Sequence, residues 1–293
     1  MVELNPWAEL YSHKIEDANI CIMGIPFDGG VSCGKGAALA PEMIRSLSRY
    51  LPPYTSDGDL ITNKIYDTGD VQVVLDWEDY YEKVEKQAFK LLNSNKFCLF
   101  IGGDHSTTIP VHKAFFKKFE DKKIGIIHFD SHSDICDEYD GHKWSHACTQ
   151  KRAIEQLKSP EDIAFVGIRS WEKEEVEYFK KHPKIILKRA SDVTKERPQA
   201  IAKQLIEKFK TYDVVYLSLD IDVLDPAFAP GTGTPEAGGL TTRELIEIII
   251  ELFKELQIGA MDVVEVSPPL DSKNNITSWA ALKIMYEVFY LVK

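Results

Sequence analysis

Cysteine is scarce in this sequence and is not arranged for cross-linking. The five cysteines, an odd number, include no C-x-x-C pair, so neither a disulfide framework nor a zinc knuckle is indicated and a reducing compartment fits best. Long apolar runs are also missing, since no run approaches the roughly eighteen residues that span a bilayer. The first ten residues, MVELNPWAEL, lack the basic and apolar regions of a secretory signal. We therefore expect a cytoplasmic protein with no membrane partner.

Blocks of basic residues are lacking as well. The formal net charge of -11 is spread along the chain, which argues against nucleic acid or an anionic membrane as the partner. Hydrophobic residues make up 44% and charged residues 28% of the chain, which excludes disordered and fibrous classes. No internal repeat, low-complexity tract or Ser/Gly linker interrupts the sequence, so we expect one folded domain over residues 1–293.

Short apolar or β-branched runs alternate with amphipathic stretches of helical length. The runs interpreted as buried strands are residues 19–25, 96–102, 124–129, 162–168, 213–219 and 259–266. Helices are expected at residues 79–92, 174–181, 198–210 and 242–256. This alternation predicts an α/β fold in which a mostly parallel central sheet is covered by helices on both faces.

Polar side chains gather directly after three of the expected strands. The three segments are GGDHS at 102–106, HFDSHSD at 128–134 and SLDID at 218–222. All three map to one edge of the sheet, where ligands bind in open parallel sheets. A Pro/Gly-rich loop at 225–239, too long for an ordinary turn, follows the third segment at the same edge.

The carboxylates of these segments are expected to crowd together. Asp130, His132 and Asp134 are spaced by two, as are Asp220 and Asp222, and in extended chain this period directs side chains to one side. Two carboxylates about 4 Å apart repel by roughly 4 kcal/mol at an effective dielectric of 20. Four of them cannot gather without cations, and two divalent ions would balance their charge.

Two divalent ions at this edge would favour hydrolysis, because paired metals lower the pKa of a bound water. Oxygen-rich ligation with two imidazoles favours manganese, while cobalt, nickel, iron and zinc stay possible. A hydroxide bound to the ions leaves one negative charge, which a monocationic substrate would neutralise. Each segment also has an interpretation without metal: GGDHS as a turn with a helix N-cap, and the aspartates as solvated strand ends. The three segments together at one edge favour the metal site.

Several motifs, in order, resemble those of the ureohydrolases, the arginase and agmatinase family, and of the agmatinase branch in particular. They are GIPFDGG at 24–30, KGAALAPEMIR at 35–45, the three polar segments, LDPAFAPGTGTPEAGGL from Leu224 and EVSPP from Glu265. The resemblance implies a single ureohydrolase-like catalytic domain over 1–293 with a three-layer α/β/α, arginase/deacetylase-like fold. It also implies two Mn²⁺ ions per chain, hydrolysis of agmatine to urea and putrescine in polyamine biosynthesis, and a homo-oligomer, a trimer or hexamer.

The same resemblance implies the metal ligands. Those of the first ion would be His105, Asp130, Asp134 and Asp220, and those of the second Asp130, His132, Asp220 and Asp222. Asp130 and Asp220 would bridge the two ions. His128 is expected to pack beneath the ions rather than bind one.

The resemblance further implies catalytic and substrate-binding residues. His146 occupies the place of a catalytic histidine that shuttles a proton and contacts the substrate, although His142 lies only four residues earlier. Asp134 would act on the reaction intermediate. Glu265 matches a glutamate that grips the guanidinium group, and Thr234 lines the guanidinium pocket.

Some residues depart from the family pattern or are expected to be uninvolved. Ser131 stands where alanine is usual and Ala147 where glycine is common, and neither change removes a ligand. Cys136 and Cys148 lie near the site in sequence and are expected to be inert. The remaining histidines, which we expect at the surface, are His13, His112 and His182.

The choice of substrate stays open at the level of sequence. Asp137, Glu138 and Asp140 form an acidic loop that would suit the ammonium group of agmatine, but a solvated acidic loop explains them equally well. Within the family, arginine, guanidinobutyrate, guanidinopropionate or a formimidoyl compound could be the substrate instead. Outside it, a mononuclear zinc deacetylase on the related fold and a metal-stabilised binding protein without catalysis are the competing hypotheses.

Overall fold

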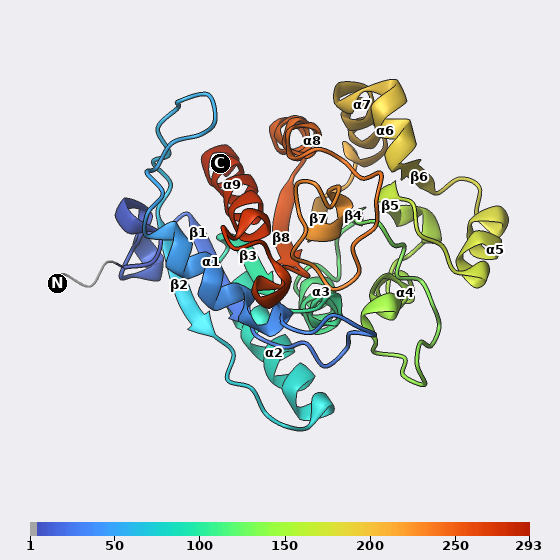
Figure 1. Ribbon diagram of the computed structural model, residues 1–293, viewed down its shortest axis with the longest axis horizontal. Helices are drawn as coiled ribbons and strands as arrows, with labels where there is room; N and C mark the ends of the chain where they lie inside the picture. The colour runs from blue at the N-terminus through green and yellow to red at the C-terminus, as the bar shows by residue number, and fades with distance from the viewer. Residues whose placement is uncertain (1–4) are drawn as a thin grey trace.

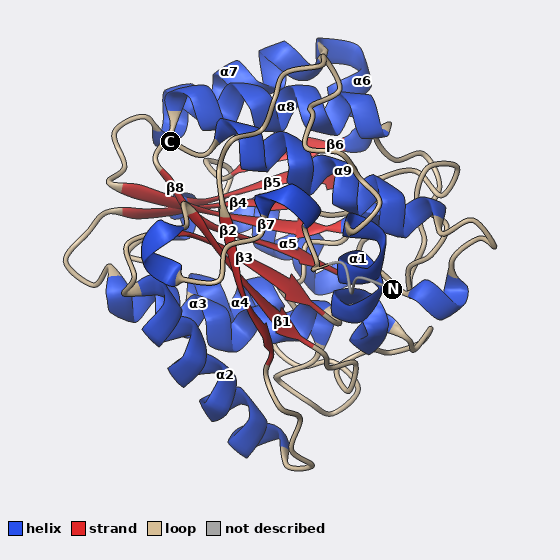
Figure 2. Ribbon diagram, turned by 90° about the vertical axis from the view of Figure 1, so that its left-hand side faces the viewer, coloured by secondary structure: helices blue, strands red, loops and turns tan. Residues whose placement is uncertain are grey.

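The computed structural model describes residues 5–293 (Figure 1), so the start of the expected 1–293 domain and of the segment MVELNPWAEL lies outside the described residues. One sheet of eight parallel strands lies between two layers of helices (Figure 2), which confirms the predicted three-layer α/β fold. The strands are β1 (Ile20–Ile25), β2 (Ile65–Asp70), β3 (Phe97–Gly102), β4 (Ile124–Phe129), β5 (Ile163–Ile168), β6 (Ile186–Arg189), β7 (Val214–Asp220) and β8 (Ile258–Val264). Their spatial order is β2-β1-β3-β8-β7-β4-β5-β6.

The six predicted strands are present, whereas the two outermost strands were not predicted. The strands β2 and β6 form the two sides of the sheet and each pairs with a single neighbour. In β2 only Ile65 is fully buried, and β6 has no fully buried residue. Edge strands lie partly in solvent, so their sequences carry no continuous apolar run.

Nine α-helices cover the sheet within residues 5–293. They are α1 (Ala40–Ser48), α2 (Trp77–Leu92), α3 (Thr108–Lys118), α4 (Thr149–Ile154), α5 (Lys173–Lys181), α6 (Ala190–Glu196), α7 (Pro198–Phe209), α8 (Thr242–Glu255) and α9 (Ile276–Leu291). The four predicted helices correspond to α2, α5, α7 and α8. None of the helices in this part of the chain is both long and apolar enough to cross a bilayer.

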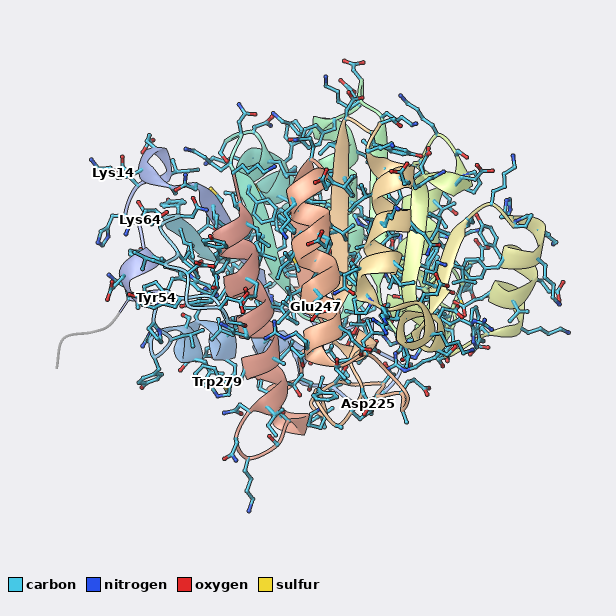
Figure 3. All side chains as sticks on the ribbon, turned by 90° about the horizontal axis from the view of Figure 1, so that it is seen from above. Lys14, Tyr54, Lys64, Asp225, Glu247 and Trp279 are labelled. Atoms are coloured by element: carbon cyan, nitrogen blue, oxygen red, sulfur yellow. The ribbon has the colours of Figure 1, made fainter. Side chains whose placement is uncertain are left out.

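Two hydrophobic cores form, one on each face of the sheet. Helices α1 and α6–α9 contribute to one core, and helices α2–α4, with α5 packed against them, to the other. Alternate residues of a strand enter opposite cores, as Ile20 and Cys21 of β1 do. In Figure 3, Glu247 marks α8 and Trp279 marks α9, which lie side by side over the first core.

One histidine expected at the surface is buried. His112 lies on the sheet-facing side of α3, is 1% exposed, and its ring centroid is 4.6 Å from that of Tyr216. Burial, followed by the charges of His105 and His128, lowers the pKa of His112 to about 3, so the ring is neutral. The surface prediction for His112 is therefore wrong, because position 112 belongs to the apolar face of a helix that the sequence pattern did not reveal. His13 is exposed and His182 half-buried.

The topology brings the polar segments together. Strands β3, β8, β7 and β4 are consecutive neighbours at the centre of the sheet, and all are parallel. The segments 102–106, 128–134 and 218–222 therefore follow strands whose carboxyl ends lie at one edge, as predicted. Residue Glu265 directly follows β8 at the same edge. After β3 the chain crosses to β4 and continues outward to β6, and it then returns to fill the centre of the sheet with β7 and β8. Ligands of open parallel sheets bind at such a reversal of the strand order.

Candidate metal centre

The first group of candidate ligands surrounds His105, which begins a short 3-10 helix directly after β3. Its Nδ1 lies 3.1, 3.0 and 3.2 Å from carboxylate oxygens of Asp130, Asp134 and Asp220. These side chains are at most 7% exposed. Nδ1 of His105 and Oδ2 of Asp130 are buried without a hydrogen-bond partner among the described residues. Buried polar atoms that converge without partners fit a metal ion.

The second group surrounds His132, whose Nδ1 lies 3.1 Å from Oδ2 of Asp222 and 3.4 Å from Oδ1 of Asp130. The side chain of His132 is 27% exposed, so this group faces the solvent more than the first. Asp130 contacts the histidines of both groups. Asp220 contacts His105 and accepts a hydrogen bond from the backbone of Asp222 at 2.8 Å. The structure brings all six expected ligands together, and their assignment to two ions stays a prediction.

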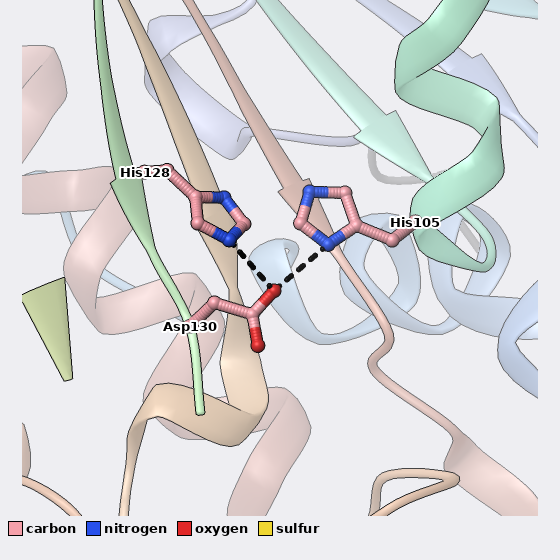
Figure 4. Close-up of side chains that lie close together, drawn as sticks. All are labelled: His105, His128 and Asp130. Atoms are coloured by element: carbon pink, nitrogen blue, oxygen red, sulfur yellow. Dashed lines mark ion pairs between the residues drawn. The ribbon is translucent and has the colours of Figure 1, made fainter. Parts of the chain in front are cut away.

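His128 also lies next to Asp130, with Nε2 at 3.3 Å from Oδ2 (Figure 4). Both of its ring nitrogens already have other partners: Gln150 donates to Nδ1 at 3.0 Å, and Nε2 donates to the carbonyl of His132 at 3.1 Å. Burial, followed by the charge of His105, lowers the pKa of His128 to about 3. A neutral ring with both nitrogens engaged holds the side chain of Gln150 and the backbone at His132 in place. It offers no free lone pair to a metal.

The carboxylates carry an electrostatic cost that cations would remove. Burial, followed by the charges of Asp222 and Asp134, raises the pKa of Asp130 to about 7. Burial and the charges of Asp222 and Asp130 also raise the pKa of Asp220 well above its ordinary value. Crowded buried carboxylates take up protons unless positive charge is supplied. Divalent ions would supply that charge.

His146 and Glu265 are hydrogen-bonded to each other beside these groups. Nδ1 of His146 is 3.2 Å from Oε1 of Glu265, and the same Oε1 accepts the backbone N–H of His105 at 2.9 Å. Burial alone lowers the pKa of His146, but the hydrogen bond and the charge of Glu265 outweigh it and raise the pKa to about 9. No hydrogen bond reaches Oε2 of Glu265 within residues 5–293, which leaves that oxygen available to a ligand.

A pocket opens over the candidate ligands. Its lining residues are Ser32, His132, Asp134, Cys136, Tyr139, His146, Ala147, Ser170, Trp171, Glu172, Glu175, Asp220 and Thr234. The lining includes four carboxylates and no lysine or arginine. Thr234 lines it as expected, with Oγ1 at 3.4 Å from Oδ2 of Asp222. Glu265 is 1% exposed and is not itself a lining residue, but it is hydrogen-bonded to His146, which is.

Two acidic lining residues of the pocket come from a segment that sequence reasoning missed. Glu172 and Glu175 belong to the start of α5, directly after β5. Their positions at the carboxyl edge were a usable signal, but the segment was interpreted only as an amphipathic helix. The acidic loop contributes Tyr139 instead, while Asp137 is exposed and pairs with Arg152 at 3.1 Å. Neither Glu138 nor Asp140 lines the pocket.

His142, the second histidine of the loop, does not line the pocket. Its ring packs on Trp77 with centroids 4.6 Å apart, and its Nδ1 accepts the backbone N–H of Trp144 at 3.2 Å. The cysteines Cys136 and Cys148 are buried, and burial followed by the charge of Asp134 raises the pKa of Cys148 to about 12. The thiol of Cys148 is therefore neutral.

Arg169 is a further residue that the sequence did not single out. Its guanidinium group donates to the carbonyl oxygens of Asp222 and Glu236, each at 2.7 Å, and of Leu224 at 3.2 Å. Its backbone N–H donates to the carbonyl of Ser131 at 2.9 Å. Arg169 thus joins the segments that follow β4 and β7 to the Pro/Gly-rich loop 225–239.

Comparisons with known proteins show the family of this chain. The Arginase family matches residues 18–290. An agmatinase from Bacillus cereus is 35% identical over an alignment that covers 96% of this chain and 97% of that protein. An agmatinase from Neisseria meningitidis is 38% identical over 94% of this chain and 87% of its own length. The crystal structure of the agmatine ureohydrolase of Thermoplasma volcanium superposes with a TM-score of 0.87 at 31% identity, covering 99% of this chain and 95% of that chain. The chain therefore belongs to the arginase family.

Proposed function

We propose that this protein hydrolyses agmatine to urea and putrescine with two divalent metal ions, natively manganese. Membership of the arginase family and the similarity to proteins named agmatinase support the reaction class. One observation carries the choice of substrate: apart from the candidate metal ligands Asp134 and Asp220, the pocket is lined by the carboxylates of Glu172 and Glu175 and by no lysine or arginine. A guanidino compound with a cationic far end fits such a pocket, and one with a carboxylate does not.

The six converging side chains would hold the ions. His105, Asp130, Asp134 and Asp220 would bind one, and the second would be bound by His132 and Asp222 together with the shared Asp130 and Asp220. When bound, such ions lower the pKa of water and supply the nucleophile for attack on the guanidinium carbon. Their positive charge would also keep Asp130 and Asp220 ionised.

Glu265 and Thr234 would hold the guanidinium group. The free Oε2 of Glu265 would accept a guanidinium N–H in a charge-assisted hydrogen bond. The hydroxyl of Thr234 lies at the pocket wall beside Asp222. Together they would orient the carbon toward the metal centre, and orientation of this kind is a large part of catalysis.

His146 would give a proton to the amine that leaves. Its Nδ1 is bonded to Glu265, while Nε2 lies 3.2 Å from the backbone N and 3.1 Å from Oγ of Ser32. The neutral ring accepts from the Ser32 N–H, and the protonated ring donates to Ser32 Oγ. Both protonation states therefore have a partner, as a proton-transferring histidine requires. Asp134, which also lines the pocket, would stabilise and deprotonate the reaction intermediate.

Glu172 would select the far end of the substrate, and Glu175, which is buried and accepts the backbone N–H of Glu172 at 2.9 Å, would add to the negative charge. The ammonium group of agmatine would be attracted to them, whereas the carboxylate of arginine or guanidinobutyrate would be repelled. Like charges about 4 Å apart repel by about 1 kcal/mol in water and about 4 kcal/mol at an effective dielectric of 20. Because Glu172 is exposed, its repulsion of a carboxylate should be closer to about 1 kcal/mol than to about 4 kcal/mol.

A substrate panel tests the proposal. The manganese-loaded protein is offered agmatine, arginine, guanidinobutyrate and guanidinopropionate, and urea release is measured. We expect the highest kcat/KM for agmatine, by a factor of about ten or more, in line with the repulsion above. Preference for arginine or a guanidino acid would overturn the choice of substrate. Absence of urea with every compound would overturn the enzymatic function.

We further propose that residues 1–293 act as one catalytic domain in the cytoplasm, in polyamine biosynthesis, and assemble as a homo-trimer or homo-hexamer. These proposals rest on the sequence resemblance. Light scattering of the purified protein tests the assembly, and a monomer would contradict it.

A further inference from the structure

The two ring nitrogens of His105 have different surroundings. Nδ1 faces the carboxylates of the candidate metal centre, and Nε2 lies 3.0 Å from Oγ of Ser218 on β7. Both side chains are fully buried. An imidazole binds a metal through the nitrogen that carries no hydrogen. A metal ion at Nδ1 therefore requires the hydrogen of the His105 ring to be on Nε2.

The hydroxyl of Ser218 is oriented by a second buried residue. Its Oγ lies 3.0 and 3.3 Å from the two carboxylate oxygens of Asp262 on β8. An ionised carboxylate only accepts hydrogen bonds, so the single proton of Ser218 points to Asp262. The lone pairs of Ser218 Oγ are then left to face His105 Nε2, which must donate.

Asp262 is held by further donors. Thr108 Oγ1 donates at 2.9 Å, the Tyr216 hydroxyl at 2.8 Å and the Leu219 backbone N–H at 3.1 Å. These donors come from α3 and β7 and converge on one carboxylate that has no lysine or arginine partner among the described residues. The arrangement fixes Asp262 as an acceptor next to Ser218.

We propose that Asp262, acting through Ser218, is a positioning residue that keeps His105 in the tautomer able to bind a metal ion. The inference rests on the proposed metal centre and adds residues that make no contact with the ions. It applies to one ion alone, because no described residue is hydrogen-bonded to Nε2 of His132. Loss of the Ser218 hydroxyl should therefore weaken the ion at His105 and leave the ion at His132 in place.

The test compares Ser218→Ala with Tyr216→Phe. Both remove one buried hydroxyl that donates to Asp262, but Tyr216 does not contact His105. In Mn²⁺ titration calorimetry of metal-free protein we expect Ser218→Ala to weaken one of two ions about 10–100-fold. Tyr216→Phe should bind both ions as the wild type does. Equal loss in the two variants would overturn the proposal.

Asp262→Asn tests whether Asp262 acts through Ser218. Alone it should weaken the same ion, and in the Ser218→Ala background it should add no further loss, since the path is already broken. If the two substitutions weaken Mn²⁺ binding additively, Asp262 does not act through Ser218 and the proposal is contradicted. Thermal unfolding of each metal-free variant reports whether it is folded before the titration.

The tautomer is read directly in the wild type, without any variant. The probe is ¹⁵N-histidine NMR of the metal-free protein, with His105 assigned by comparison with His105→Gln. Spectra are recorded at alkaline pH, because the tautomer is defined only for the neutral ring. Burial alone lowers the pKa of His105, but the hydrogen bonds to Asp130, Asp134 and Asp220 outweigh it and raise the pKa. A neutral ring with its hydrogen on Nε2 supports the proposal, and a neutral ring with its hydrogen on Nδ1 overturns it. This result does not depend on metal binding or urea release, so failure of the proposed function is distinguishable from failure of this inference.

Discussion

Two acidic residues of the site adopt the left-handed backbone region, which is rare for residues other than glycine. Asp134 has φ 54° and Glu265 has φ 63°, and each such conformation costs about 1–3 kcal/mol. The backbone N–H groups of Gln150 and Lys151 donate to the carbonyl of Asp134, and Glu265 N–H donates to Gly103. These backbone hydrogen bonds thus hold Asp134 and Glu265 in a conformation that an unconstrained backbone would seldom adopt.

Asp130 is the residue whose loss should damage the site most, because its carboxylate contacts both histidine groups. We expect Asp130→Ala to lose at least one of two Mn²⁺ ions and to reduce urea release below detection. Asp137→Ala, which removes an exposed carboxylate outside the pocket, is the matched control and should retain both. Unchanged metal content in Asp130→Ala would remove Asp130 from the set of ligands.

The Glu265–His146 pair should make stability depend on pH. Glu265 raises the pKa of His146 to about 9, above the ordinary value of about 6.5. The pair therefore stabilises the fold fully below about pH 6.5 and loses this contribution as pH rises through about 9. Melting of metal-free wild type and Glu265→Gln should differ most at pH 6 and converge near pH 10. A gap that widens with pH would contradict this linkage.

At the scale of elements, the site is assembled where β3, β4, β7 and β8 end, and Arg169 joins the segments beyond them. Arg169→Met leaves the carbonyls of Asp222, Leu224 and Glu236 without their donor. We expect a loss of about 2–4 kcal/mol in unfolding free energy and faster proteolysis within loop 225–239. Arg169→Lys keeps the charge but not the planar group of donors, so it should lie between wild type and Arg169→Met. A Met variant as stable as the wild type would exclude this role.

The start of α5 should set the preference for the substrate's far end. We expect Glu172→Gln to raise KM for agmatine with little change in kcat, because the far end binds equally in ground and transition states. Glu138→Gln, in the acidic loop outside the pocket, is the control and should behave as the wild type. An effect of Glu138 alone would place recognition in the loop instead.

How far the sequence predicts these elements depends on their surroundings. Central strands such as β4 are buried on both faces, so their apolar runs are visible in sequence, whereas β2 and β6 at the sheet edges are not. Helix α9 was missed because it is buried on nearly all sides and therefore lacks a polar stripe.

The same limit applies to the site. The crowding of carboxylates was predicted because Asp130, Asp134, Asp220 and Asp222 follow strands at a spacing of two, whereas the set of ligands, His105 included, was implied by the family resemblance. The roles of Ser218, Asp262 and Arg169 depend on neighbours that only the sheet order brings close. The role of the acidic loop stayed open at the level of sequence for a related reason. Which carboxylates face a cavity depends on the packing of α5 and the loop, and residue spacing does not encode it.

At the scale of the whole molecule, four negatively charged side chains are buried close together in the interior. The buried carboxylates Asp130, Asp134, Asp220 and Asp222 lie within one crevice of a protein whose formal net charge is -11. Such crowding is costly unless the carboxylates take up protons or doubly charged ions are bound. The proposed catalysis depends on those ions.

The most direct measurement is the number of metal ions per chain. Purified protein is stripped with a chelator, dialysed against Mn²⁺ and counted by elemental analysis alongside protein concentration. We predict two ions per chain. A count of one, or a protein that retains no ion, would contradict the proposed metal centre.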